Sequence, residues 1–188
     1  MPRFSALLVP GAGTVLFSEW RTGTIARARA AADALLAEWR ASPPVPARLA
    51  QDVFLADDGS GLLFLAQWTS DEAHLAWARA HRATTVSRVD TRVPGIERPG
   101  LNRTRPPRAT VYDAERPAEV FALAVGPAET TGRPAPAPGL LGAHVHLTRD
   151  GARAFVVTEW ADAASHAASH AASGGAAGRR FTPYGSHR

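Results

Sequence analysis

The pattern of apolar and polar residues divides the first half of the chain into strand-like and helix-like segments. Residues 15–23, VLFSEWRTG, are rich in β-branched and aromatic side chains and end in Gly, which predicts a strand. After Thr24, a candidate N-cap, apolar residues recur at three- and four-residue spacing, which predicts an amphipathic helix over 25–41. The proline-rich SPPVP that follows is expected to end this helix.

The next segments predict a hairpin, a second helix and a last strand. Apolar runs at 49–56 and 62–69 flank DDGSG, whose Asp-Gly step is typical of hairpin turns. Residues 70–89 predict a helix, with Ser70 as N-cap and acidic residues at the positive end of its dipole. Residues 104–114 can form a fourth, edge strand, since their two prolines cannot donate to a ladder. This β-α-β-β-α-β order is ferredoxin-like.

The same pattern returns in the second half of the chain. LFLAQWTSDEAHLAWARAH aligns without a gap with FVVTEWADAASHAASHAAS, 92 residues later, which places Trp68 on Trp160 and His74 on His166. Strands are predicted at 119–126, 140–148, 152–160 and 179–187, and a helix at 162–173. Four prolines within 127–139 exclude a long first helix from this half.

The repeat predicts an α+β chain with two ferredoxin-like units, residues 1–112 and 113–188, the second lacking most of its first helix. Each unit alone would leave one face of its sheet uncovered. We therefore expect the two sheets to pack as in a dimeric α+β barrel with the helices outside. This arrangement is an intramolecular pseudo-dimer, and a homodimer of the whole chain is compatible with it.

Composition narrows the possible partners and location. The 188 residues are 45% hydrophobic and include no Cys, which excludes disulfides and Cys-ligated metals. The formal net charge is +4, but no Arg cluster is interleaved with stacking aromatic residues, so no nucleic-acid partner is expected. The chain has no apolar run of membrane-spanning length, and the N-terminal apolar run is too short for a signal peptide. We expect a cytoplasmic protein without a membrane partner.

A strand ending in Gln-Trp or Glu-Trp, an acidic helix start and a His-bearing helix together resemble the antibiotic biosynthesis monooxygenase family. The second half, from GLLGAHVHLT to SHAASHAAS, is similar to tandem-domain actinobacterial members, and VPGIERPGLNRTRPPR resembles their inter-domain connection. The resemblance implies a dimeric α+β barrel. It also implies O₂-dependent oxygenation of a polycyclic aromatic, polyketide-type or quinol metabolite in secondary metabolism, without metal, flavin or other cofactor.

Fold alone does not settle function. Related barrels bind or degrade haem, or bind ligands without chemistry. The alternatives are therefore a non-catalytic aromatic-ligand-binding or accessory protein, and a haem-binding protein. The haem-degrading relatives use an Asn, Trp and His set, and the only Asn here, Asn102, lies in the predicted connection.

Trp68 and His81 are the candidate catalytic residues. Trp68 matches the family's Trp at a strand end, where it can either stack on a flat substrate or seal the core. His74, Trp77 and His81 share one helix face, and a His beside a cavity is a candidate general base. Four of the five tryptophans lie in the first half, which we expect to hold the aromatic cavity.

The remaining candidates line a substrate site or the interior of the barrel. His144 and His146 alternate on one strand face, and His166 and His170 are four residues apart on a helix, spacings that can bind metal. No carboxylate motif accompanies them, so a polar lining is the expected role and no metal is predicted. The candidate substrate-binding residues are Trp20, Phe54, Gln67, His74, Trp77, His144, His146 and Trp160.

Overall fold

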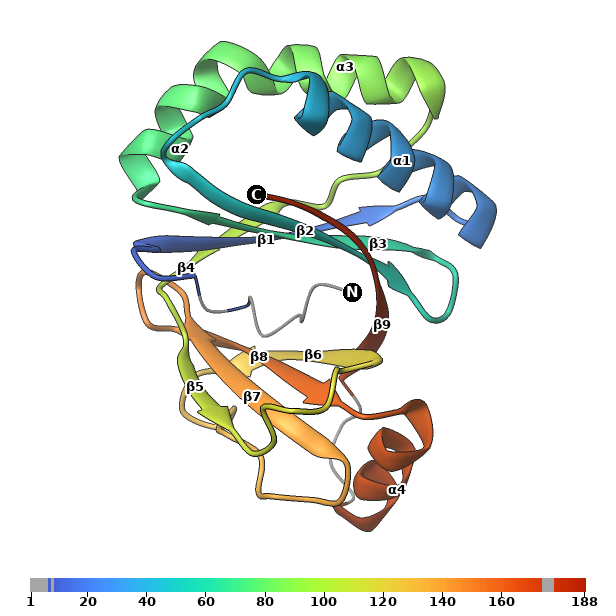
Figure 1. Ribbon diagram of the computed structural model, residues 1–188, viewed down its shortest axis with the longest axis vertical. Coiled ribbons are helices and arrows are strands. Elements are labelled where there is room, and N and C mark those ends of the chain that lie inside the picture. The colour runs from blue at the N-terminus through green and yellow to red at the C-terminus, as the bar shows by residue number, and fades with distance from the viewer. Residues whose placement is uncertain (1–6, 8, 174–177) are drawn as a thin grey trace. The chain divides into compact units, whose positions relative to one another are not determined.

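The computed structural model describes residue 7 and residues 9–173 and 178–188. The chain divides into two compact units. The first unit comprises residues 9–103 and 183–188, and the second unit comprises residues 104–182 together with Leu7. Each unit is an α+β structure built on an antiparallel sheet (Figure 1). The predicted division at residue 112 and the predicted barrel packing of the sheets stay predictions.

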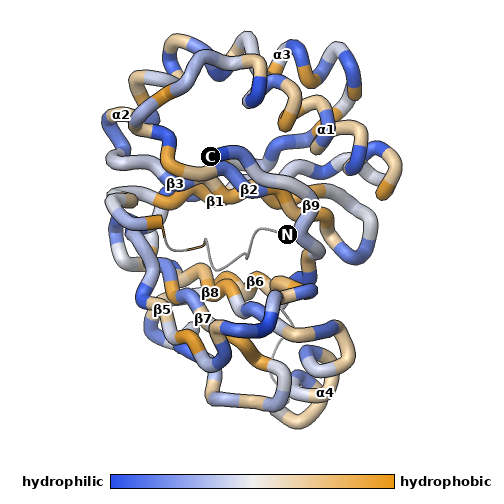
Figure 2. The backbone as a smooth tube through the Cα atoms, in the orientation of Figure 1, coloured by the Kyte–Doolittle hydropathy of each residue, from blue (hydrophilic) through white to orange (hydrophobic). Residues whose placement is uncertain are grey.

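The first unit has the ferredoxin-like strand order β4-β1-β3-β2. Its elements are β1 (Thr14–Arg21), α1 (Ile25–Ala41), β2 (Arg48–Ala56), β3 (Gly61–Trp68), α2 (Asp71–Trp77), the π-helical turn η2 (Ala78–Arg82), α3 (Ala83–Arg92) and β4 (Leu101–Thr104). β3 pairs antiparallel with both β1 and β2. Apolar residues gather along β1 and β3 (Figure 2).

The first helix occupies the predicted residues 25–41. The Thr24 side chain accepts a hydrogen bond from the Arg27 backbone N–H, which satisfies one of the donors left open at a helix start. The buried face of α1 carries small Ala residues together with Leu35, Leu36 and Trp39, which pack on the sheet. This helix therefore forms one wall of the space above β1 and β3.

The second predicted helix differs from expectation by one local feature. The continuous helix over 70–89 is in fact α2, η2 and α3, and it runs to Arg92. Ser70 caps it as predicted, with its side chain accepting from the Ala73 N–H. The π turn holds an extra residue relative to an α-helix, so residues after it are rotated about the helix axis. Periodicity alone could not reveal this insertion.

The second unit has the strand order β9-β6-β8-β7-β5. Its elements are β5 (Arg108–Val111), β6 (Val120–Pro127), β7 (Leu140–Leu147), β8 (Arg153–Trp160), α4 (Ala163–Ser173) and the first part of β9 (Arg179–His187), whose residues from 183 onward belong to the first unit. Residues 128–139 contain no helix, as their prolines lead one to expect. The four strands β9-β6-β8-β7 repeat the strand order of the first unit, and β5 adds an edge strand beside β7.

The expectation for the fourth strand of the first half was wrong in position. Residues 104–114 contain β5, which pairs with β7 in the second unit, whereas the strand at the β4 position is Leu101–Thr104. Pro106 and Pro107 explain the difference, because they separate the two strands and interrupt the ladder. Both strands lie at sheet edges, as expected for a segment near prolines.

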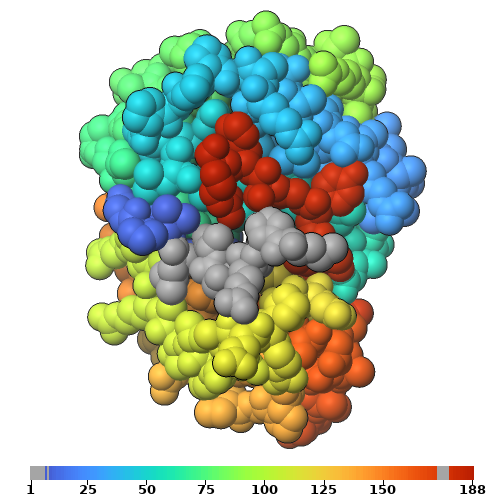
Figure 3. Space-filling model, in the orientation of Figure 1, coloured from blue at the N-terminus to red at the C-terminus, as the bar shows by residue number. Residues whose placement is uncertain are grey.

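The last residues of the chain return to the first unit. Tyr184 Oη donates to Asp33 on α1 over 2.8 Å, and Arg188 donates to the buried Asp52 over 2.8 Å. This segment, red in Figure 3, lies on the surface of the first unit beside α1. None of the helices within the described residues is both long and apolar enough to cross a membrane.

Replacing Gly61 with Ala is expected to lower the free energy of unfolding of the first unit by about 3 kcal/mol. A Cβ at this position of β3 would overlap the backbone carbonyl oxygen of Trp20 on β1, and backbone cannot move aside as a flexible side chain can. Urea unfolding would measure the loss. Gly132→Ala is the matched control, since nothing lies near its added Cβ. Equal unfolding midpoints for the two variants would contradict this packing of β1 on β3.

Candidate active site in the first unit

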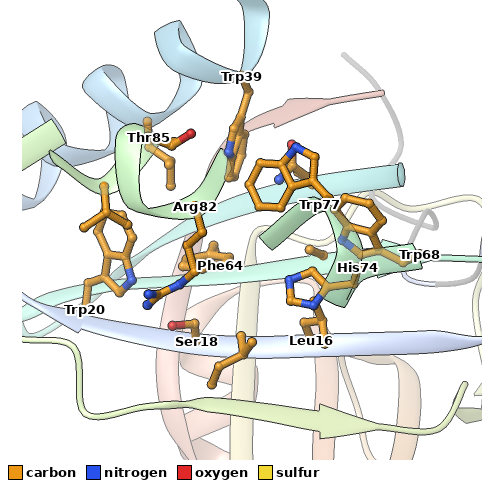
Figure 4. A pocket seen from close by; sticks show the side chains of 15 residues that line it. Leu16, Ser18, Trp20, Trp39, Phe64, Trp68, His74, Trp77, Arg82 and Thr85 are labelled. Atoms are coloured by element: carbon orange, nitrogen blue, oxygen red, sulfur yellow. The ribbon is translucent and has the colours of Figure 1, made fainter. Parts of the chain in front are cut away.

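A cavity of about 60 Å³ lies in the first unit between the sheet and its helices (Figure 4). We call it the first-unit cavity. Alternate residues of β1 and β3 face it because side chains of a strand alternate between the two faces of a sheet. Its aromatic lining residues are Trp20, Trp39, Phe64, Trp68 and Trp77, and its polar ones are Ser18, Gln51, His74, Arg82 and Thr85.

The aromatic rings contact one another in angled arrangements. The Trp68 ring centroid is 5.2 Å from that of His74, at an interplanar angle of 77°, and 5.5 Å from that of Trp77. Trp20 meets Phe64 edge-on at 5.4 Å. Edge-to-face contacts of this kind are favourable beyond the area that they bury. The wall is therefore a fixed aromatic frame suited to a flat, apolar ligand.

His74 is the titratable residue held deepest in this wall. It is 5% exposed, and its Nδ1 lies 3.0 Å from Nη1 of Arg103, which is itself 3.5 Å from Asp71 Oδ1. A guanidinium only donates, so Nδ1 accepts this hydrogen bond. The proton of the neutral imidazole therefore sits on Nε2. His74 can donate from Nε2, and Arg103 fixes that tautomer.

Burial lowers the pKa of His74 to about 4, assisted by the positive charges of Arg103 and Arg82 and opposed by Asp71. The imidazole is thus neutral at pH 7. In this state it is a hydrogen-bond donor without a charge of its own, next to two guanidinium groups. Such an arrangement favours an anionic oxygen on a bound ligand.

The π turn decides which side chain follows Trp77 into the cavity. His81 was expected on the face shared by His74 and Trp77, yet its side chain is exposed and does not line the cavity. Its ring lies 6.0 Å from that of Trp77 on the outside. Arg82, one residue later, lines the cavity instead, as the extra residue of η2 would produce. Figure 4 shows Arg82 reaching toward the strand that carries Ser18.

Two residues of the wall bury polar atoms without a hydrogen-bond partner among the residues that the structure describes. These atoms are the indole Nε1 of Trp68 and the amide Oε1 of Gln51. A buried donor or acceptor left unpaired costs about 1–3 kcal/mol, and native proteins keep few of them. A ligand that accepted a hydrogen bond from Trp68 and donated one to Gln51 would recover this cost.

The cavity volume sets a limit on the ligand that fits without movement. A cavity of about 60 Å³ holds roughly four to six water molecules. This is room for about one aromatic ring. A ligand with several fused rings therefore requires the exposed Arg82, and Trp77 beside it, to move outward.

Not all predicted site residues meet at this cavity. Trp20, Trp68, His74 and Trp77 line it, whereas Phe54 and Gln67 are buried in strands without lining it. Gln67 accepts a hydrogen bond from the Val9 N–H over 3.1 Å. The alternation that places Trp68 in the cavity turns Gln67 to the opposite face of the sheet.

His144, His146 and Trp160 belong to the second unit. His144 Nε2 lies 2.5 Å from Glu159 Oε1, and burial lowers the pKa of His146 to about 3, assisted by His144. Within the described residues, no group of three or more His, Cys, Asp or Glu side chains is arranged to hold a metal ion. Trp160 lines a separate cavity of the second unit together with His166 and His170.

Sequence reasoning did not single out Gln51, Ser18 or Arg82. Gln51 is a polar residue in the apolar run 49–56 and pairs with Ala66, so alternation from Trp68 would have placed it on the cavity face. Ser18 pairs with Phe64 on the same face. No signal in the sequence would have found Arg82, since its position depends on the π turn.

The first unit is expected to lose stability as the pH falls from about 6.5 to about 4. His74 takes up its proton near pH 4 when folded, but near pH 6.5 when unfolded. The unfolded state thus binds more protons in this window, which costs the folded state about 3 kcal/mol on acidification. Urea unfolding at pH 7 and pH 4.5 would measure the difference. His74→Asn should shrink it, whereas His81→Asn, at the exposed histidine of the same helix, should not. An unchanged difference in His74→Asn would refute the assignment.

Comparisons with known proteins place the fold. No family model and no curated protein sequence matches the chain. An anthrone oxidase-like protein has a similar structure, with a TM-score of 0.67 and 15% identity over 94% of this chain and 93% of that chain. A chlorite dismutase mutant from Candidatus Nitrospira defluvii gives 0.56 at 11% identity, covering 97% of this chain and 95% of that one.

A candidate monooxygenase from Lactobacillus acidophilus NCFM gives a TM-score of 0.52 at 10% identity, covering 93% of this chain and 94% of that chain. At these identities the likeness shows the fold alone. The chain therefore shares the ferredoxin-like α+β fold of these solved structures, whereas the dimeric barrel that the sequence resemblance implied stays a prediction.

Proposed function

We propose that the chain is a cofactor-independent monooxygenase that oxidises a hydroxylated polycyclic aromatic metabolite, of the anthrone or quinol type, with O₂ in the first-unit cavity. The observation that carries this proposal is that one cavity combines five aromatic lining residues, a neutral His74 and two buried polar atoms without a hydrogen-bond partner among the described residues. The structural likeness to an anthrone oxidase-like protein supports the same substrate class. The two sheets would form the barrel, with one chain supplying both units.

The polar atoms define how such a substrate would bind. The Trp68 indole N–H would donate to a ring oxygen, and Gln51 Oε1 would accept from a ring hydroxyl. The aromatic frame would hold the ring system in one plane. Binding by one donor and one acceptor fixes orientation, which places the reacting carbon next to the space left for O₂.

The charges around His74 would favour the substrate in its anionic form. Arg103, hydrogen-bonded to His74, and Arg82 at the cavity both stabilise a negative ring oxygen. His74 would donate its Nε2–H to that oxygen. Because Nδ1 already accepts from Arg103, His74 acts as a donor and not as a general base, and the substrate proton leaves to water beside Arg82. This role replaces the one that we expected for His81.

The electron-rich anion can then react with O₂ directly. One electron passes from the anion to O₂, and the resulting radical and superoxide combine to a peroxide anion at the ring carbon. This anion takes up a proton from water, which replaces the one the substrate released, and becomes a hydroperoxide. Loss of water leaves a carbonyl, so a methylene group and O₂ yield a ketone and one water. The apolar wall keeps superoxide from escaping to solvent during this step.

Oxygen consumption by chelator-treated protein with anthrone as the substrate tests the proposal. We expect uptake of one O₂ per anthrone, with anthraquinone as the product, at a rate above that of the uncatalysed oxidation. Tight binding of anthrone without uptake would instead support the non-catalytic ligand-binding protein of the sequence analysis. No binding and no uptake with any anthrone or naphthol would refute both.

Haem binding fits the second unit poorly. His166 and His170 line its cavity and are the residues that would bind the haem iron. However, none of the described residues that line this cavity is Arg or Lys, which the two haem propionates would call for. The residues that line this cavity therefore do not fit haem.

A further inference from the structure

The second unit contains a cavity of about 460 Å³ on the face of its sheet toward α4. We call it the second-unit cavity. Ala122, Ala124 and Thr158 form its floor on β6 and β8, and Trp160, His166 and His170 form an aromatic side. The loop between β6 and β7, with Thr130 and Thr131, lines it where the first unit has α1.

Trp160 and His166 reproduce the arrangement of Trp68 and His74. Their ring centroids are 5.2 Å apart at 84°, against 5.2 Å and 77° in the first unit. Both tryptophans end a β3-type strand, and both histidines lie six residues later on the following helix. The second-unit cavity therefore occupies the position in its unit that the first-unit cavity occupies in the other.

Strand register shows why the second cavity is larger. Trp68 pairs with Thr14, and Trp160 pairs with Val120, so β6 residues correspond to β1 residues 106 positions earlier. Leu16 corresponds to Ala122, and Trp20 to Gly126. On the helix, Trp77 corresponds to Ser169. Loss of these large side chains, and of α1, leaves room for several fused rings without any movement.

His166 corresponds to His74, but the other polar groups that would act on a substrate in the first unit are either already engaged or absent here. The Trp160 Nε1–H donates to Thr158 Oγ1 over 2.8 Å, so this donor is already used. Gln51 corresponds to Ala143, because each pairs with the residue two positions before the tryptophan. None of the described lining residues is Arg, Lys, Asp or Glu. The cavity thus offers stacking surface without charge stabilisation.

We propose that the second-unit cavity is a second binding site, which holds a neutral, flat, multi-ring aromatic molecule without converting it. His166 and His170 stack at 6.3 Å with an interplanar angle of 14° beside Trp160, which suits a planar ring system. The inference rests on the proposed function only for the class of ligand. A neutral, flat ligand of this kind matches the quinone that the first unit would produce, because the quinone has lost the acidic hydrogen of the substrate.

Equilibrium dialysis with 1,8-dihydroxyanthraquinone, an already oxidised probe, tests this site. The wild-type chain is expected to bind two molecules. Ala124→Phe, which fills the second-unit cavity, should reduce this to one, and Ala66→Phe should remove the other by filling the first-unit cavity. Val111→Phe adds the same ring at an exposed position of the second unit and should leave both sites intact.

The outcomes separate this inference from the proposed function. One bound molecule that is lost in Ala66→Phe and kept in Ala124→Phe would overturn the second site and leave the first standing. One bound molecule that is lost in Ala124→Phe and kept in Ala66→Phe would support the second site and contradict binding in the first-unit cavity. Ala122→Leu, a milder filling change, gives the same test should Ala124→Phe fail to fold. A haem absorption band in the purified protein would also overturn the inference.

Discussion

Replacing Trp68 with Phe is expected to lower kcat/KM for anthrone oxidation about 100-fold or more. Phe keeps an aromatic ring against His74 and Trp77 but removes the unpaired Nε1–H. A preorganised donor to a developing oxyanion is typically worth about two to three orders of magnitude in rate. Initial rates of oxygen uptake measure the effect.

Trp160→Phe is the matched control for this change. It removes the same N–H from the equivalent strand end of the second unit, where Thr158 already accepts the hydrogen bond. We expect this variant to oxidise anthrone at the wild-type rate. Equal losses in the two variants would show that the effect of Trp68→Phe is one of packing and would contradict the role of its N–H.

Replacing Gln51 with Leu is expected to lower kcat/KM about 10- to 100-fold for substrates that carry a ring hydroxyl. Leu has a similar size but cannot accept a hydrogen bond, so the substrate hydroxyl would be buried without a partner, at a cost of about 1–3 kcal/mol. Competition between 1,8-dihydroxyanthrone and unsubstituted anthrone measures the loss of selectivity.

The two substrates act as internal controls for Gln51→Leu. Unsubstituted anthrone has no hydroxyl to pair with Oε1, so the variant should oxidise it at least as fast as the wild type does. An equal loss of kcat/KM with both substrates would contradict this role. It would show that Gln51 supports the structure of the cavity and does not recognise the substrate hydroxyl.

Helices and strands could be predicted from the sequence where the local signals agreed with one another. Helix α1 begins after Thr24 and ends at Ala41, because its cap, its periodicity and the following prolines all agree. The hairpin of β2 and β3 follows in the same way from Asp58-Gly59 between two apolar runs. The recurrence of Trp68 as Trp160 identified the two strand ends that now prove to face cavities.

The candidate site was readable only in part, because helix geometry and strand pairing are long-range properties. An ideal helix would carry His81 on the face of His74, and the π turn brings Arg82 there instead. The tautomer of His74 depends on its hydrogen bond with Arg103, which comes from β4 and is 29 residues away in sequence. Likewise, nothing local in RPPRATV indicates that β5 pairs with β7.

The central claim is that the first-unit cavity transfers oxygen from O₂ to an aromatic ring carbon with the protein's own residues alone. Mass spectrometry of the product formed by chelator-treated protein from anthrone under ¹⁸O₂ tests it most directly. We predict one labelled oxygen in the anthraquinone, formed rapidly by the wild type and slowly by Trp68→Phe. Unlabelled product, or anthrone returned unchanged by the wild type, would contradict it.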